Sequence, residues 1–198
     1  MANKTRQKRN TVLTIDDCSG NLLPDTTAIL GRFHTYYADL YSSKLEGTDE
    51  ELTTYLDQTT LVWVEGEMRE WLNQTISLEN VQVTIKELPA GKAPGSDGLP
   101  AEVYKEYSDI LSPWLLEVYG EALEKGHLPH SMMEAVLAVL LKPRKDPTSC
   151  ASYIPLSLLN TDNKIFMTIL AQWLQPIMPL LVLPEQAGFV PQHSTALN

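Results

Sequence analysis

The sequence predicts an α+β fold that is mostly helical. Apolar residues recur at three- and four-residue spacing in several segments that begin with capping residues, which is typical of amphipathic helices. One continuous apolar run, residues 136–141, is typical of a strand covered on both faces. Between the helices lies a loop, residues 89–100, with three prolines and three glycines. That composition excludes helix and central strand, and predicts an ordered or mobile loop.

The first elements are an arm, a hairpin and a helix. Residues 1–10 hold four cations and no acid. We interpret them as a solvated terminus, with nuclear import or phosphate binding as alternatives. Residues 12–23 predict a short hairpin around a polar turn. A helix follows from Pro24 to Tyr41, and its aromatic stripe is interpreted as a packing face instead of a base-stacking platform.

The remaining elements are predicted from helix-capping residues and from prolines and glycines that end helices. Thr48 and Glu51 fit a capping box for a short acidic helix. Residues 59–73 are ambiguous, with Trp63 and Trp71 as expected anchors. Four more helices are predicted at 77–88, 101–107, 112–125 and 161–177, and an extended segment at 151–159.

Composition limits the classes of function. The net charge is −10, which argues against an autonomous nucleic-acid binder and leaves only a local basic cluster for that purpose. The two cysteines, Cys18 and Cys150, lie far apart, and no signal-peptide core follows the basic arm. These features predict an intracellular protein, in the nucleus or the cytoplasm. No apolar run approaches the ~18 residues that a membrane span needs, so no membrane partner is expected.

Several motifs fail as catalytic or metal sites. The Gly91-Lys92 pair lacks the preceding glycine and the following hydroxyl of a phosphate-binding loop. The adjacent Asp16 and Asp17 resemble a two-carboxylate metal site, but a polar turn follows at once, so we interpret them as part of that turn. His127 has only His130 nearby to help bind zinc. No nucleophile signature is present.

The strongest basic cluster is Lys142, Arg144 and Lys145, which directly follow the apolar run. Three cations at the end of a strand can bind phosphate, because the rigid strand backbone fixes the direction of their side chains. On composition alone, it is equally plausible that these charges only keep an exposed turn soluble.

The order of these pieces resembles one protein family. Residues 88–104 read Leu-Pro-Ala-Gly-Lys-Ala-Pro-Gly-Ser-Asp-Gly-Leu-Pro-Ala-Glu-Val-Tyr. They closely resemble the amino-terminal block of reverse transcriptases from non-LTR (long interspersed element) retrotransposons. Further similar blocks follow in family order at 126–129, 140–148, 152–160, 162–174 and 184–191. Residues 12–78 are similar, more loosely, to the connector that precedes the polymerase.

The resemblance implies a division into a basic arm (1–10), a helical connector (11–85) and an incomplete reverse transcriptase domain (86–198). The last part corresponds to the fingers side of a right-hand polymerase fold, which holds template and nucleotide. The candidate nucleotide- and nucleic-acid-binding residues are Lys92, Lys142, Arg144, Lys145, Gln186, Gly188 and Phe189.

Three departures from the family bear on activity. A lysine at the position of Lys142 and an arginine at the position of Ile154 face the triphosphate in the family, and isoleucine cannot make the bidentate phosphate contact of a guanidinium. Gln192-His193 stand where the family usually shows Gly-Arg. In the family, one metal-binding aspartate comes shortly after the position of Asn198, and an adjacent pair, in an aromatic-X-Asp-Asp segment, comes later.

These observations predict an incomplete, palm-less reverse transcriptase that does not catalyse polymerisation in isolation. No catalytic or metal-binding residue is assigned, and Mg²⁺ is expected only for a full-length polymerase. The alternatives are a non-catalytic module that binds an RNA template or an RNA–DNA duplex, an interaction protein whose partner supplies the palm in a longer form, and a remnant without function.

Overall fold

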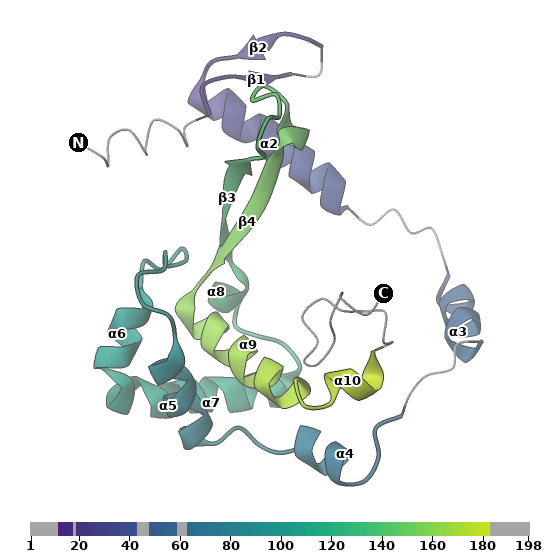
Figure 1. Cartoon of the computed structure of the whole chain (residues 1–198), viewed down its shortest axis with the longest axis vertical. Helices are drawn as coiled ribbons and strands as arrows, with labels where there is room; N and C mark the ends of the chain where they lie inside the picture. Colours follow the sequence, from purple (N-terminus) through teal and green to yellow (C-terminus); the bar gives the residue numbers. More distant parts are fainter. Residues whose placement is uncertain (1–11, 18, 43–47, 59–62, 183–198) are drawn as a thin grey trace. The chain divides into compact units, whose positions relative to one another are not determined.

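The computed structural model describes residues 12–17, 19–42, 48–58 and 63–182. By contacts these residues divide into two compact units. The first unit lies within 1–56 and 137–157, and the second within 57–136 and 158–198. Figure 1 shows the elements of each unit. No helix among the described residues is long and apolar enough to cross a membrane.

The first unit combines a small hairpin with a long helix. Strands β1 (Ile15–Asp16) and β2 (Leu22–Leu23) pair antiparallel. Helix α2 (Thr26–Tyr41) begins where the Asp25 carboxylate accepts a hydrogen bond from the Ala28 N–H at 3.0 Å. Both predictions are confirmed.

The packing face of α2 is shorter than the sequence predicts. Ile29, Phe33 and Tyr37 are buried, whereas Leu40 and Tyr41 are 52% and 67% exposed. The first three side chains pack against the part of the chain near Tyr153 and Cys150, and the last turn of the helix extends beyond that contact. Helix α3 (Asp49–Asp57) begins at the predicted capping box, in which Thr48 and Glu51 exchange two hydrogen bonds.

The second unit is a group of helices around one core. Its helices are α4 (Glu67–Leu72), α5 (Leu78–Glu87), α6 (Ala101–Glu106), α7 (Ser108–Lys125), α8 (His130–Met133), α9 (Thr161–Leu174) and α10 (Met178–Leu181). Helix α5 packs against α6, α7 and α9, as Figure 1 also shows. The core of this unit contains Val81, Ile85, Tyr119, Ile165, Ile169 and Trp173.

Two predictions for this unit are wrong in detail. Helix α7 begins four residues before the predicted start and continues through Pro113. A proline inside a helix removes one hydrogen bond, but Ser112 and Tyr119 on the same helix are completely buried, so packing outweighs the local cost. Trp63 is not an anchor, because it is 80% exposed. Trp71 is partly exposed and its indole N–H donates to the Trp173 carbonyl at 3.1 Å.

Strands β3 (Ala135–Leu141) and β4 (Tyr153–Leu159) form a second two-stranded sheet, with a short 3₁₀ turn, η1 (Cys150–Ser152), before β4. The two strands run side by side in Figure 1. The predicted strand is confirmed, and the extended segment predicted at 151–159 is confirmed from Tyr153 onward, whereas residues 151 and 152 belong to η1. The prediction that both faces of the apolar strand are covered is wrong for the described residues, because six apolar side chains are 41–44% exposed: Val136, Leu137, Leu140, Leu141, Ile154 and Leu156.

Candidate nucleic-acid interface

A tight turn at the end of β3 carries the basic cluster. The Lys145 N–H donates to the Lys142 carbonyl at 3.3 Å, so residues 142–145 form a four-residue turn with Pro143 at its second position. Arg144, at the third position, has a φ of 61°. Glycine or asparagine usually occupies such a left-handed position, and holding an arginine there costs on the order of 1 kcal/mol. The turn therefore displays a guanidinium at a place where backbone preference alone favours glycine.

Hydrogen bonds fix the segment that follows the turn. The Asp146 carboxylate accepts from the Thr148 N–H at 2.9 Å and from its hydroxyl at 2.7 Å, and these bonds lower the pKa of Asp146. The Tyr153 hydroxyl donates to the Pro147 carbonyl at 2.7 Å, and the Asp16 N–H donates to the Thr148 carbonyl at 2.7 Å. Both the first hairpin and β4 thus hold this loop in place.

Lys142 lies where the strand becomes the turn. Its N–H donates to the Ser152 carbonyl at 2.8 Å, which continues the pairing of the two strands. Its ammonium donates to the Ala151 carbonyl at 2.9 Å. An ammonium has three donors, so this contact orients the charge and leaves capacity for a phosphate oxygen.

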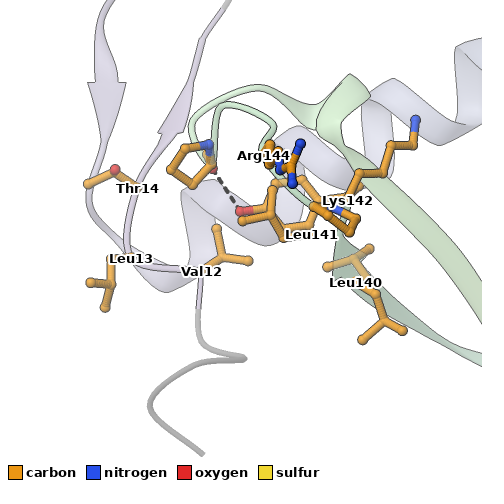
Figure 2. A pocket seen from close by; sticks show the side chains of 11 residues that line it. Val12, Leu13, Thr14, Leu140, Leu141, Lys142 and Arg144 are labelled. Atoms are coloured by element: carbon orange, nitrogen blue, oxygen red, sulfur yellow. Dashed lines mark hydrogen bonds between the residues drawn. The ribbon is translucent and has the colours of Figure 1, made fainter.

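Lys142 and Arg144 line a pocket of about 1000 Å³ in the first unit. Figure 2 shows Val12, Leu13 and Thr14 on one side of this pocket and the end of β3 on the other. None of the described residues that line the pocket is acidic. The pocket therefore combines apolar walls with two cations, a surface suited to an anionic group attached to an apolar body.

The structure brings together only part of the predicted site. Lys142 and Arg144 line the same pocket, and Lys145 belongs to the same turn. Lys92 belongs to the second unit. The remaining candidates, Gln186, Gly188 and Phe189, lie outside the described residues.

Sequence reasoning missed one cation and one wall of the two pockets. Lys164, in the first turn of α9, lines a pocket of the second unit. The wall formed by residues 12–14 depends on long-range packing against β3, so no local signal could have revealed it. A lysine on a predicted helix is not by itself a signal, because the polar face of an amphipathic helix usually carries charged residues, so Lys164 could not have been singled out from the sequence.

Asp17 lies in the turn, as predicted, whereas Asp16 is the last residue of β1 and pairs with Leu22. The Asp17 carboxylate accepts from the N–H groups of Ser19 and Asn21 at 2.8 and 3.1 Å, and from the Asn21 side chain at 3.0 Å. These bonds lower the pKa of Asp17, with the Asn21 side chain as the largest cause. Across the described part of the chain, no three His, Cys, Asp or Glu residues are grouped closely enough to hold a metal ion.

Comparison with known proteins identifies the family. The chain is 33% identical over 190 residues to the uncharacterized 149 kDa protein of transposon TX1 from Xenopus laevis, covering 95% of this chain. It is 31% identical over 122 residues, 61% of the chain, to the RNA-directed DNA polymerase from mobile element jockey of Drosophila melanogaster. It is 27% identical over 125 residues to the Pol polyprotein of the type-1 retrotransposable element R1 of Bradysia coprophila. The chain belongs to the family of non-LTR retrotransposon reverse transcriptases.

The chain matches a small share of each relative. It spans 14% of the TX1 protein, 13% of the jockey polymerase and 12% of the R1 polyprotein. No protein-family model matches the sequence.

Ile154, where the resemblance implies an arginine, lies outside the pocket of the first unit. Ile154 is the second residue of β4, next to Tyr153, and side chains of adjacent strand residues point to opposite faces. Tyr153 lines the pocket with Lys142 and Arg144, whereas Ile154 does not line it and is 44% exposed. The side chain of Ile154 therefore lies on the other face of β4 from Tyr153, away from the pocket that Lys142 and Arg144 line.

Proposed function

We propose that residues 86–198 form the fingers side of a right-hand polymerase, and that residues 11–85 form the connector that precedes it. In this proposal the turn at the end of β3 contacts the phosphates of an RNA template or an RNA–DNA duplex through Lys142, Arg144 and Lys145. The names of the jockey and R1 relatives support a polymerase context, and the exposed basic turn supports phosphate contact.

The observation that carries the proposal is the cation-lined pocket with no acidic side chain among its described lining residues. The turn behind it is held by hydrogen bonds on both sides, so its charges are preorganised. The protein as a whole carries a net charge of −10, so general electrostatic attraction to nucleic acid is absent. Binding must therefore depend on local charges of this kind.

Salt-dependent binding tests this proposal. Fluorescence anisotropy with a labelled 20-nucleotide RNA is measured between 50 and 200 mM salt, for the wild type and for the triple variant Lys142→Ala/Arg144→Ala/Lys145→Ala. Three lost phosphate contacts at about 0.7 each lower the salt slope by roughly 2, so the wild type loses about 20-fold more affinity across this range than the variant. Replacement of Lys125, which pairs with Glu121 on α7, is the matched control.

Two results would overturn the proposal. The first is an unchanged salt slope in the triple variant. The second is an equal loss of affinity in the Lys125→Ala control, because that would indicate a response to net charge instead of a site. Circular dichroism of each variant checks that the helices are retained.

We also propose that the 198 residues do not transfer nucleotides by themselves. Their one pair of adjacent aspartates is committed to the turn around Asp17, and no aromatic-X-Asp-Asp segment occurs among them. Magnesium belongs, in this proposal, to a full-length polymerase that supplies the metal-binding carboxylates. Incubation with a primed template, nucleotides and Mg²⁺ is expected to give no extension, and extension would contradict the proposal.

A second candidate function is contact with another part of a polymerase. This function is favoured by the exposure of apolar side chains on β3 and β4. We propose that a palm present in a longer form covers these side chains. The isolated chain is then expected to self-associate in size-exclusion chromatography with light scattering, and Leu140→Ser/Leu156→Ser to reduce that self-association. A strictly monomeric wild type would argue against it.

A further inference from the structure

Helix α7 of the second unit carries a row of exposed residues along one face. The helix packs against α5 and α6, and its residues Ser112, Tyr119 and Ala122 are buried. Six exposed residues follow one another at alternating spacings of three and four, beginning at the N-cap: Tyr107, Ile110, Trp114, Glu117, Glu121 and Glu124. Residues at this spacing lie on one face of a helix. We call these six residues the α7 stripe.

The first half of the α7 stripe is apolar. The side chains of Tyr107, Ile110 and Trp114 are between 54% and 67% exposed. A single exposed apolar side chain is common on protein surfaces, but three on successive turns of one face form a patch. Tryptophan and tyrosine are enriched among the residues that contribute most to the binding energy of protein interfaces. This half therefore favours contact with an apolar surface of another molecule.

The second half of the α7 stripe is acidic. Glu117, Glu121 and Glu124 are exposed on the same face. Lys125 pairs with Glu121 on the surface of the helix, which leaves the other two carboxylates as uncompensated charges of the stripe. An acidic surface repels the phosphates of nucleic acids and of anionic lipids. The partner of this face is therefore neither a nucleic acid nor an anionic membrane.

The order of the two halves also argues against a second copy of this chain. In a parallel pair of α7 helices, the glutamates of one copy would face the glutamates of the other, which is unfavourable. In an antiparallel pair, the apolar half of each copy would cover the carboxylates of the other, and burying unpaired charges is costly. The complement of the α7 stripe is instead a helix with an apolar half and a basic half.

We propose that the α7 stripe binds an amphipathic helix of a separate protein. Apolar side chains of that helix contact Tyr107, Ile110 and Trp114, and its lysine or arginine side chains pair with the three glutamates. The 18 residues of α7 span about 27 Å, enough for several turns of a partner helix. Permanent interfaces are largely apolar, whereas half of this stripe is charged, so we assign it to a partner that binds and dissociates and not to another part of the polymerase.

Designed peptides test the proposal. Two labelled helical peptides of about 21 residues, or three heptads, carry leucines at the seam positions of one half and arginines at those of the other. The two peptides have opposite orders, so that one matches a parallel and the other an antiparallel arrangement. By fluorescence anisotropy, one of them is expected to bind the wild type at least about tenfold more tightly than the same peptide with glutamates in place of arginines. Binding of neither peptide, or equal binding of the glutamate peptide, overturns the proposal.

An exchange of charges identifies the contact. Glu117→Arg/Glu124→Arg leaves the pair of Glu121 with Lys125 in place. This variant is expected to lose about tenfold in affinity for the arginine peptide and to gain about tenfold for the glutamate peptide. Asp109→Asn, which changes an exposed acid of α7 outside the stripe, is the matched control and is expected to bind as the wild type does. No gain for the glutamate peptide would show that charge pairing does not direct binding, and the proposal fails.

The apolar half has its own test. Trp114→Ala is expected to weaken peptide binding by at least about tenfold, because an exposed tryptophan at the centre of a contact is a typical hot spot. Leu123→Ala, at an exposed leucine of α7 outside the stripe, is the matched control. Equal losses in the two variants overturn the proposal. RNA binding by Trp114→Ala is expected to match that of the wild type, so this proposal and that for the basic turn can fail separately.

The assignment to a separate protein is tested on a longer form that includes a palm. The peptide is expected to bind that form within about twofold of its affinity for the 198 residues. Loss of peptide binding in the longer form would show that another part of the polymerase covers the α7 stripe, and would overturn the assignment.

Discussion

The two units differ in the size of their buried cores and in the cations that they expose. Among the described residues, the core of the second unit contains twelve buried residues, mainly from its helices, whereas that of the first contains six. The first unit nevertheless carries the most concentrated group of cations, on a turn held by local hydrogen bonds. The comparison indicates that the larger core holds the helix that displays the α7 stripe, and that the smaller core supports an exposed turn.

The strongest test of this difference is a large-to-small substitution in the larger core. Ile165 is 0% exposed and lies among the packed helices of the second unit. Ile165→Ala is expected to cost about 4 kcal/mol of unfolding free energy, because rigid neighbours cannot close the cavity. Urea unfolding measures the cost. A loss below about 1 kcal/mol would show that these helices do not form a close-packed core.

The matched substitution in the first unit is Ile15→Ala, because Ile15 is also 0% exposed. Here the core is smaller and its neighbours can relax, so the expected cost is about 2 kcal/mol, at the low end for such a change. Hydrogen exchange should show loss of protection in peptides of the first unit only. An equal loss of protection in both units would show that they unfold together as one cooperative unit.

Local signals predicted most of the elements. Asp25, Ser77 and Gly126 mark helix ends because capping depends on residues that are near in sequence. The start of α7 was missed because Ser112 and Pro113 resemble a helix start, with a proline in the first turn, whereas packing carries the helix through both residues from Ser108.

The candidate site was predictable only in part. The basic turn at Lys142 follows from three cations within four residues, whereas the contact between Gly95 and Asn160 joins segments 65 positions apart. The exposure of Leu137 and Leu140 could not be predicted either, because an apolar run shows that a strand prefers burial but not whether the chain supplies the cover.

The caps offer a smaller comparison of the two units. Ser77 and Asn80 form a reciprocal box at the start of α5, in which the Asn80 N–H donates to the Ser77 hydroxyl at 3.1 Å and the Ser77 N–H donates to Asn80 Oδ1 at 2.9 Å. Asp25 makes one such bond at the start of α2. Ser77→Ala is expected to cost about 1.5 kcal/mol and Asp25→Ala about 1 kcal/mol by urea unfolding. A larger cost for Asp25→Ala would contradict the value assigned to the reciprocal box.

The smallest expected effects are opposite pH dependences in the two units. Hydrogen bonds, chiefly from the Asn21 side chain, lower the pKa of Asp17 in the first unit, whereas burial raises the pKa of Asp162 in the second. The ordinary value of both is 3.8. A lowered pKa means that Asp17 stabilises the fold above pH 3.8 and that this contribution disappears as the pH falls through the folded-state pKa.

For Asp162 the sign reverses. The charged form is disfavoured in the folded state, so Asp162 destabilises the fold at neutral pH, and protonation relieves this penalty as the pH falls through the raised pKa toward 3.8. Asp162→Asn keeps an oxygen for the Asn163 N–H, which Asp162 Oδ1 accepts at 2.6 Å, and is expected to be more stable than the wild type at pH 7. Asp17→Asn is expected to be less stable at pH 7. In urea unfolding the difference for Asp162→Asn should vanish as the pH falls to 3.8, whereas that for Asp17→Asn should persist at pH 3.8 and vanish only as the pH falls through the lowered folded-state pKa of Asp17, since every other carboxyl group is common to wild type and variant. Differences of the same sign at pH 7 would show that burial does not outweigh hydrogen bonding at Asp162.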